Sequence, residues 1–181
     1  NARAKCRGRS IDVFALPTEA QWEYMTRAGT ETKYFCGNTT NELAVYASMK
    51  FKYDKDSGGN PIPAVNPDQS YSEANYPWRI HGVGSYLPNP WGFYDVYGNV
   101  AEWCNDKFGT YPAYSEDEVT EDPVGPETSS SVVNRGGCFY DGDGLCSSGT
   151  RKDEGSNGSA ANGFQGRWGA RWGFRVSCGL K

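Results

Sequence analysis

One short segment near the N-terminus carries the clearest helix signals in this chain of 181 residues. Thr18 is a good N-cap, Gln21 sits three residues later as in a capping box, and Glu19 suits the positive end of the helix dipole. Gly29 then predicts the end of the helix. Residues 30–90 hold prolines at 61, 63, 67 and 77 and an Asp-Ser-Gly-Gly-Asn run, which predicts a long irregular stretch. The chain must therefore fold around ordered loops.

Aromatic residues supply much of the material for a core. Hydrophobic residues make up 37% of the chain and aromatic residues 14%, with six Trp, twelve Tyr and eight Phe. This composition favours short strands and ordered loops over a helix bundle. The length suits one domain with a real core, and no repeat, coiled coil or low-complexity linker marks an internal boundary.

Turn signals separate three short segments that we expect to be strands. Residues 97–100, Tyr-Gly-Asn-Val, predict a tight turn because Gly and Asn readily take positive φ. A strand over Val100–Cys104 follows. The Asp-Pro-Val-Gly-Pro turn at 122–126 precedes a strand over Ser131–Asn134, and the last strand is expected over Gly173–Cys178.

Charge and hydropathy exclude two classes of partner. The formal net charge is −4 and the pI is near 5.1, without a Lys/Arg cluster. Nucleic acid is therefore not expected as a partner, because phosphate binding needs a basic face. No apolar run approaches the roughly 20 residues of a transmembrane helix, so we expect no membrane span in this chain.

The six cysteines lie far apart and never form a Cys-x-x-Cys pair. That spacing argues against a zinc ribbon or a thioredoxin-like motif. Disulfides are compatible with the spacing, which does not select among their pairings. An oxidising compartment is favoured over a cytosol full of free thiols.

The segment Phe139–Trp172 has the composition of a binding surface and no secondary-structure period. Its 34 residues hold eight Gly, four Ser, two Asn, five aromatic residues and three Arg. Aromatic side chains give large contact area at low entropy cost, Arg binds anions and aromatic faces, and Ser, Gly and Asn adapt. Four basic and four acidic residues cancel, so the segment has no single-sign field. The alternative is a long solvated Gly-rich loop.

Four blocks occur in an order that resembles the signature blocks of formylglycine-generating-enzyme-type (sulfatase-modifying factor) domains. They are Leu16–Tyr24, Pro88–Cys104, Arg135–Gly137 and Gly173–Val176, and together they span nearly the whole chain. The resemblance implies an α+β fold of the C-type lectin type, with few short antiparallel strands and long ordered loops.

The resemblance also bears on domain boundaries. We expect residues 1–181 to form a single C-type lectin-like domain. Domains of this family begin well upstream of the Leu-Pro-Thr-Glu block, which only fifteen residues precede here. We therefore expect that this domain lacks its N-terminal part; the alternative is an unusually short member.

The enzymes of this family oxidise a substrate cysteine with two active-site cysteines, four and nine residues after the second Gly of the Gly-Gly pair. In this chain those positions are Asp141 and Cys146. Cys138 stands nearby, where the family has Ser. Soft Cu(I) is held by paired thiolates, so a single Cys146 does not complete such a centre. We expect no catalysis; the alternative is a formylglycine-generating-type oxidase acting on a substrate cysteine.

A second kind of protein shares the scaffold: the variable protein of a diversity-generating retroelement. Such proteins carry a C-terminal variable region in place of the active site. The resemblance implies that residues 138–176 form a variable ligand-binding region, and that the chain is a non-catalytic display protein. Its partner is expected to be a protein or another cell-surface molecule, and its location the cell surface, the extracellular medium or a virion. A third option is a structural lectin-like module in a larger assembly.

On this interpretation, the side chains that contact ligand all lie in the variable region. Aromatic anchors, polar anchors and adaptable contacts are expected among them. The candidates are Phe139, Tyr140, Asp141, Asp143, Ser147, Thr150, Lys152, Asn157, Asn162, Phe164, Gln165, Arg167, Trp168, Arg171 and Trp172.

No cofactor is expected to be required, although a structural calcium remains an option. Asn99 and Glu102 could supply oxygen ligands to a hard cation. We favour the alternative in which Asn99 stabilises a turn and Glu102 satisfies buried backbone N–H groups. The run Trp103–Asp106 weakly resembles the Trp-Asn-Asp of sugar-binding C-type lectins, but it is interrupted and lacks the partner Glu-Pro-Asn.

Overall fold

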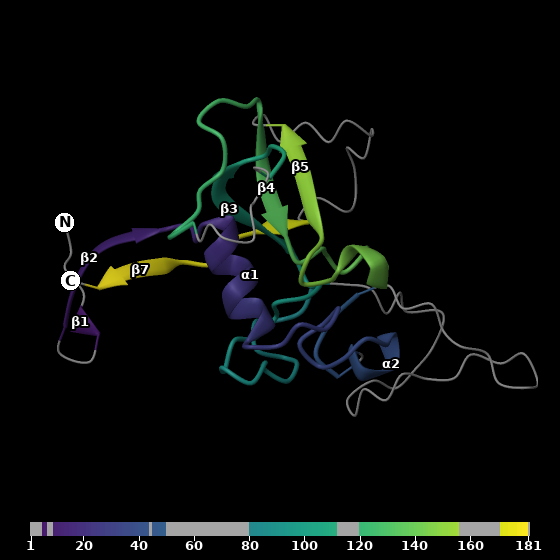
Figure 1. Cartoon of the computed structure of the whole chain (residues 1–181). Helices are drawn as coiled ribbons and strands as arrows, with labels where there is room; N and C mark the ends of the chain where they lie inside the picture. Colours follow the sequence, from purple (N-terminus) through teal and green to yellow (C-terminus); the bar gives the residue numbers. More distant parts are fainter. Residues whose placement is uncertain are drawn as a thin grey trace, which may run out of the picture.

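The computed structural model describes residues 5–6, 9–43, 45–49, 80–111, 120–155 and 171–180. Their strands form two sheets (Figure 1). The three-stranded sheet has the order β1–β2–β7, with β1 at Lys5–Cys6, β2 at Arg9–Ala15 and β7 at Ser177–Leu180. The four-stranded sheet has the order β5–β4–β3–β6, with β5 at Arg151–Gly155, β4 at Ser131–Arg135, β3 at Ala101–Lys107 and β6 at Trp172–Gly173. All pairs are antiparallel except β3 with β6.

Three helical elements complete the described part: α1 at Glu19–Arg27, α2 at Thr40–Leu43 and the 3-10 turn η1 at Asp143–Leu145. Helix α1 packs against β3 and β4 of the four-stranded sheet (Figure 1). Short strands, little helix and long connections confirm the predicted α+β fold of the C-type lectin type. None of the helices that the structure describes is long and apolar enough to cross a membrane.

The predicted start of α1 is confirmed in detail. The Thr18 hydroxyl oxygen accepts from the Gln21 backbone N–H at 3.2 Å, and the Gln21 side chain accepts from the Thr18 N–H at 3.0 Å. The helix ends where Ala28 takes a left-handed conformation with φ 48° and Gly29 follows with φ 87°. These local signals place Trp22, which is fully buried, against the sheet.

The two predicted central strands are confirmed, but the prediction of a single final strand is wrong. Gly98 and Asn99 both have positive φ, as the predicted turn requires, and β3 and β4 follow at the expected places. The strand expected over Gly173–Cys178 is instead two strands, β6 and β7, which belong to different sheets. The chain changes sheets over residues 174–176, and Arg175 holds this crossing by an ion pair with Glu102 at 2.5 Å.

Strand β5 was not predicted, and it lies inside the segment that lacks a secondary-structure period. Its sequence, Arg-Lys-Asp-Glu-Gly, has no apolar alternation. The strand forms because it pairs with β4 in continuous register, from Ser131 with Gly155 to Arg135 with Arg151. The sequence pattern of β5 alone does not predict a strand. Strand β2 was also missed.

Aromatic side chains dominate the core, as the composition predicts. One cluster is centred on Tyr34, Phe35 and Tyr97, whose rings stack or meet edge to face at centroid distances of 5.4–5.7 Å. A second cluster joins Trp22 of α1 to Cys104 and Val133 of the four-stranded sheet.

Candidate functional site

The register of β5 divides the four-stranded sheet into two faces with different chemistry. Successive side chains of a strand point to opposite sides, so Arg151 and Lys152 serve different faces. Arg151 reaches Glu19 of α1, and Lys152 reaches Asp141 in the candidate variable region. We call these the helix face and the outer face. The variable region thus begins against the outer face.

An ion pair anchors the start of the variable region to the outer face. The Lys152 ammonium lies 2.6 Å from the Asp141 carboxylate, whose side chain is 12% exposed. The same carboxylate oxygen accepts from the Cys138 backbone N–H at 2.9 Å. Asp141, at the position where the family resemblance expects the first thiol, is therefore tied to the backbone and to β5.

Aromatic side chains lie beside this ion pair. Trp172 of β6 stacks on Trp103 of β3 with 6.4 Å between ring centroids, and the Arg171 guanidinium lies 4.7 Å from the Tyr140 ring centroid. Tyr140 and Trp172 are half-buried against a small core that includes Phe139, which is only 4% exposed. The two ends of the candidate region therefore meet over the outer face.

The turn around η1 is held by polar contacts to the start of the chain. Thr40 donates to the Asp143 carboxylate at 3.0 Å, and Lys33 lies 3.5 Å from the same oxygen. Burial opposes ionisation of Asp143, but these two partners outweigh it and lower the pKa of the carboxyl below its usual value. The Ser147 and Thr150 hydroxyls hydrogen-bond each other at 2.7 Å, which closes the turn.

Two thiols lie beneath the turn. Cys138 is 2% exposed and Cys146 is fully buried, with the Cys146 sulfur 3.9 Å from the Cys138 carbonyl oxygen. Burial, with the negative charge of Asp141 adding to it, raises the pKa of Cys138 to about 11 and raises that of Cys146 further. Neither thiol forms a disulfide, and both are neutral at physiological pH.

The residues considered for calcium have protein partners. The Glu102 carboxylate accepts from the Trp22 indole N–H at 2.7 Å and pairs with Arg175, rather than with backbone N–H groups as expected. Asn99 accepts from the His81 backbone N–H at 3.0 Å, which agrees with a turn-stabilising role. Asp106 accepts from the backbone N–H groups of Glu19 and Gly125. Among the described residues, no group of three or more His, Cys, Asp or Glu is placed to hold a metal ion.

The structure brings nine of the fifteen candidate residues to the outer face or to the turn beside it. Of these, Phe139 and Ser147 are buried and the other seven are half-buried. The remaining six, which lie outside the described residues, are Asn157, Asn162, Phe164, Gln165, Arg167 and Trp168. Sequence reasoning missed Trp103, because only the pairing of β3 with β6 brings it to Trp172.

Comparisons with known proteins agree with this architecture. The chain is 34% identical to the formylglycine-generating enzyme of Streptomyces coelicolor over 131 residues, which cover 72% of this chain and 38% of that enzyme. Treponema denticola variable protein 1 has a similar structure, with a TM-score of 0.63, 29% identity and coverage of 96% of this chain and 49% of that one. PvdO from Pseudomonas aeruginosa shares the fold, with a TM-score of 0.57, 22% identity and coverage of 91% of this chain and 52% of that one.

The chain spans about two fifths of the length of the formylglycine-generating enzyme and about half of the variable protein. One family model, the sulfatase-modifying factor enzyme 1-like domain, matches residues 1–177. The signature blocks, the C-type lectin type of fold and this match agree: the chain belongs to the family of sulfatase-modifying factor enzyme 1-like domains.

Proposed function

We propose that this chain is a non-catalytic ligand-binding display protein, in which residues 138–176 form a diversified binding surface on a C-type lectin scaffold. The observation that carries the proposal is the environment of Asp141. An aspartate stands where the family resemblance expects a catalytic thiol, and it is paired with Lys152 on β5. An oxidase centre at this place would need a second sulfur, whereas an ion pair anchors the edge of a binding region.

The architecture suits a surface whose residues vary. A binding site is best held by side chains that are fixed by packing beneath it. Here buried Phe139 and the Asp141–Lys152 pair form the base, while half-buried Tyr140, Arg171 and Trp172 stand at its edge. Aromatic residues and arginine are the side chains that contribute most to protein interfaces. The likeness to the Treponema denticola variable protein supports the same interpretation.

The ligand class follows from the surface chemistry. Rigid aromatic residues beside a guanidinium, without a single-sign field, suit a protein or another cell-surface molecule. A display protein of this kind works at the cell surface, outside the cell or on a virion. Diversification by a retroelement would explain why the segment between the Arg-Gly-Gly and Gly-Phe-Arg blocks differs from the usual family sequence while the blocks themselves are nearly regular.

The flanking DNA provides the direct test. We expect a near-repeat of the 3′ coding end beside a reverse transcriptase gene, with mismatches confined to template adenines. A flank with neither element would contradict diversification. Display capacity is tested separately by randomising Tyr140, Arg171 and Trp172 and selecting against one purified protein, lysozyme. Binders that keep the parental Tm are expected; a library that stays folded and yields no binder would count against the proposal.

The alternative function is cysteine oxidation, and one observation favours it: Cys138 and Cys146 are near neighbours. Two converging thiolates could hold Cu(I). The assay is oxidation of a cysteine-containing peptide by protein supplied with copper under oxygen. Turnover that disappears in Cys146→Ser would replace the display proposal, whereas the proposal predicts no turnover by the unaltered protein.

A further inference from the structure

A cavity of about 860 Å³ lies on the helix face of the four-stranded sheet, opposite the outer face. One wall is the side of α1 that carries residues 19, 20, 23, 24 and 27, whose spacing places them together. The other wall is the segment 120–126, and Asp106 and Arg151 of the sheet contribute to the lining. The volume is in the range of sites that hold a small molecule or a few peptide side chains.

The second wall is fixed to the sheet. The Gly125 backbone N–H donates to the Asp106 carboxylate at 2.6 Å, and a Cβ at Gly125 would lie 2.5 Å from the Lys107 carbonyl oxygen. Pro123, Val124 and Pro126 make this wall apolar. The cavity thus has a firm apolar side facing the helix.

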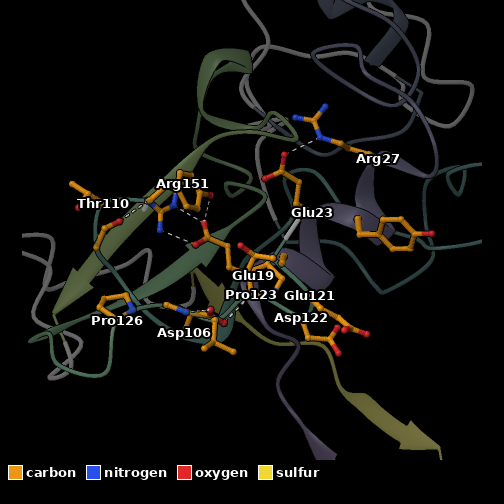
Figure 2. A pocket seen from close by; sticks show the side chains of 17 residues that line it. Glu19, Glu23, Arg27, Asp106, Thr110, Glu121, Asp122, Pro123, Pro126 and Arg151 are labelled. Carbon is orange, nitrogen blue, oxygen red and sulfur yellow. Dashed lines mark hydrogen bonds and ion pairs between the residues drawn. The ribbon is translucent and has the colours of Figure 1, made fainter. Parts of the chain in front are cut away.

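The charges of the lining favour a cation. Five carboxylates and two guanidinium groups line the cavity, a formal sum of −3, which becomes −2 with buried Arg135, the partner of Glu19 and Glu23. Both arginines are already paired: Arg27 with Glu23 at 2.8 Å, and Arg151 with Glu19 at 2.6 Å (Figure 2). Two donors at the N-terminus of α1 already have acceptors, since the Glu19 N–H donates to Asp106 and the Gln21 N–H to Thr18.

Two carboxylates remain available. Glu121 and Asp122 are exposed, and among the residues that the structure describes neither forms a salt bridge or a side-chain hydrogen bond (Figure 2). The described residues offer no cluster of ligands for a metal ion. A cation that pairs with one or two exposed carboxylates and an aromatic ring suits this lining. Tyr24, which is 70% exposed and meets Trp91 edge to face, provides an aromatic surface at the same cavity.

We infer that this cavity binds an arginine-bearing peptide segment of a protein partner. A guanidinium pairs with carboxylates through a planar fork and stacks on aromatic rings, which matches Glu121, Asp122 and Tyr24. The apolar wall accommodates the neighbouring residues of the peptide. This site lies on the opposite side of the sheet from Tyr140 and Trp172, and Arg151 is the described residue of the range 138–176 that lines it.

The probe is acetyl-Leu-Arg-Leu-amide, titrated into the isotopically labelled chain and followed by NMR. We expect saturable shifts of the Tyr24 and Val124 amides. The peptide with citrulline in place of arginine, which keeps the shape and lacks the charge, is expected to bind about twofold to thirtyfold more weakly. Equal binding of the two peptides, or shifts that avoid these amides, would overturn the assignment.

Variants separate this site from general charge effects. Glu121→Gln with Asp122→Asn should weaken binding by about twofold to thirtyfold, since two exposed ion pairs are lost. Glu31→Gln with Asp153→Asn makes the same charge change at exposed positions outside the cavity and should leave binding unchanged. Equal effects of the two double variants would refute the site.

Two more measurements fix the class of ligand. Agmatine, a guanidinium without a peptide, is expected to bind much more weakly; equal affinity would refute a peptide partner in favour of a small amine. Tyr140→Ala with Arg171→Ala alters the display edge and should leave peptide affinity unchanged. Failure of display and failure of this site are therefore distinguishable.

Discussion

Replacement of Arg135 by methionine tests the view that a buried ion network joins α1 to the sheet. The Arg135 side chain is fully buried against the ring of Trp22. Its guanidinium pairs with Glu23 and donates to the backbone carbonyls of Thr150 at 2.6 Å and Ser148 at 3.0 Å. Arg135→Met fills similar space but leaves these acceptors without their donor.

The expected cost follows from those contacts. Removing one partner of a buried ion pair costs about 3–5 kcal/mol of unfolding free energy, because the remaining groups stay desolvated. The bonds to the two carbonyl oxygens are included in this figure of about 3–5 kcal/mol, which is the cost of losing the whole guanidinium. They are not added to it, because the same guanidinium contacts Glu23, Thr150 and Ser148. For a domain of this size each kcal/mol corresponds to roughly 2–4 °C in Tm. We therefore expect Arg135→Met to lower the Tm by about 6–20 °C.

The assay is thermal unfolding followed by circular dichroism, with Arg27→Met as the matched control. Arg27 pairs with the same Glu23, but its side chain is 30% exposed. This half-buried pair within a helix contributes about 1 kcal/mol or less, and the bond from Arg27 to the Thr32 carbonyl oxygen at 3.1 Å about 1 kcal/mol more, so the control should lower the Tm by roughly 8 °C at most. If both variants lose the same amount, burial does not set the strength of this network and the reasoning fails.

Three further predictions concern the cap, the turn and the thiols. Thr18→Ala should lower the unfolding free energy by about 1 kcal/mol in urea titrations, and Thr18→Asp should retain the parental value because Asp also caps helices; equal losses would refute the cap. Gly137→Ala should destabilise strongly, since Gly137 has φ +68° and a Cβ would lie 2.5 Å from the Cys146 sulfur. Adding Cys146→Ala should recover the part of that loss caused by the sulfur but not the part from the Leu145 carbonyl oxygen at 2.8 Å, and no recovery at all would contradict the clash with the sulfur. Burial, and to a smaller extent the charge of Asp141, raise the pKa of the Cys138 thiol from 9.0 to about 11. As the pH rises, this thiol therefore ionises in the unfolded chain before it ionises in the folded one. The free energy of unfolding should then fall between pH 9 and pH 11. In urea titrations at pH 8 and pH 10, Cys138→Ser should show a smaller loss of unfolding free energy between the two pH values than the parent. An equal loss in both would show that Cys138 does not contribute to it.

The parts of the fold that local chemistry determines could be predicted from the sequence. The Thr18 cap, the turn at Gly98 and the strands on either side of residues 122–126 all depend on residues close to one another in the chain. Strand β5 depends on its pairing with β4, and its polar residues have no alternating apolar pattern from which a strand could be predicted. The last strand was predicted as one because a change of sheet leaves no local signal.

The sequence predicts where the candidate region begins and ends, but not which side chains contact one another in it. Its limits follow from the family blocks, and the nine described candidates lie on the outer face or at the turn beside it. Their contact with ligand stays a prediction. The contacts that organise it join residues far apart in the chain, such as Trp103 with Trp172 and Thr40 with Asp143. Spacing alone cannot show such pairs, because sheet order and crossover set them. The six candidates outside the described residues stay predictions.

The alternation of Arg151 and Lys152 limits the kind of variation that this region tolerates. One residue holds α1 through Glu19, and its neighbour holds the candidate region through Asp141. A shift of one residue in the pairing of β5 with β4, as an insertion or deletion within β5 would cause, would exchange their faces, and both ion pairs would be lost together. Substitutions leave the alternation of side chains between the two faces intact. Substitutions at positions other than these ion-paired residues keep the scaffold contacts, whereas a change of length within β5 breaks both ion pairs at once.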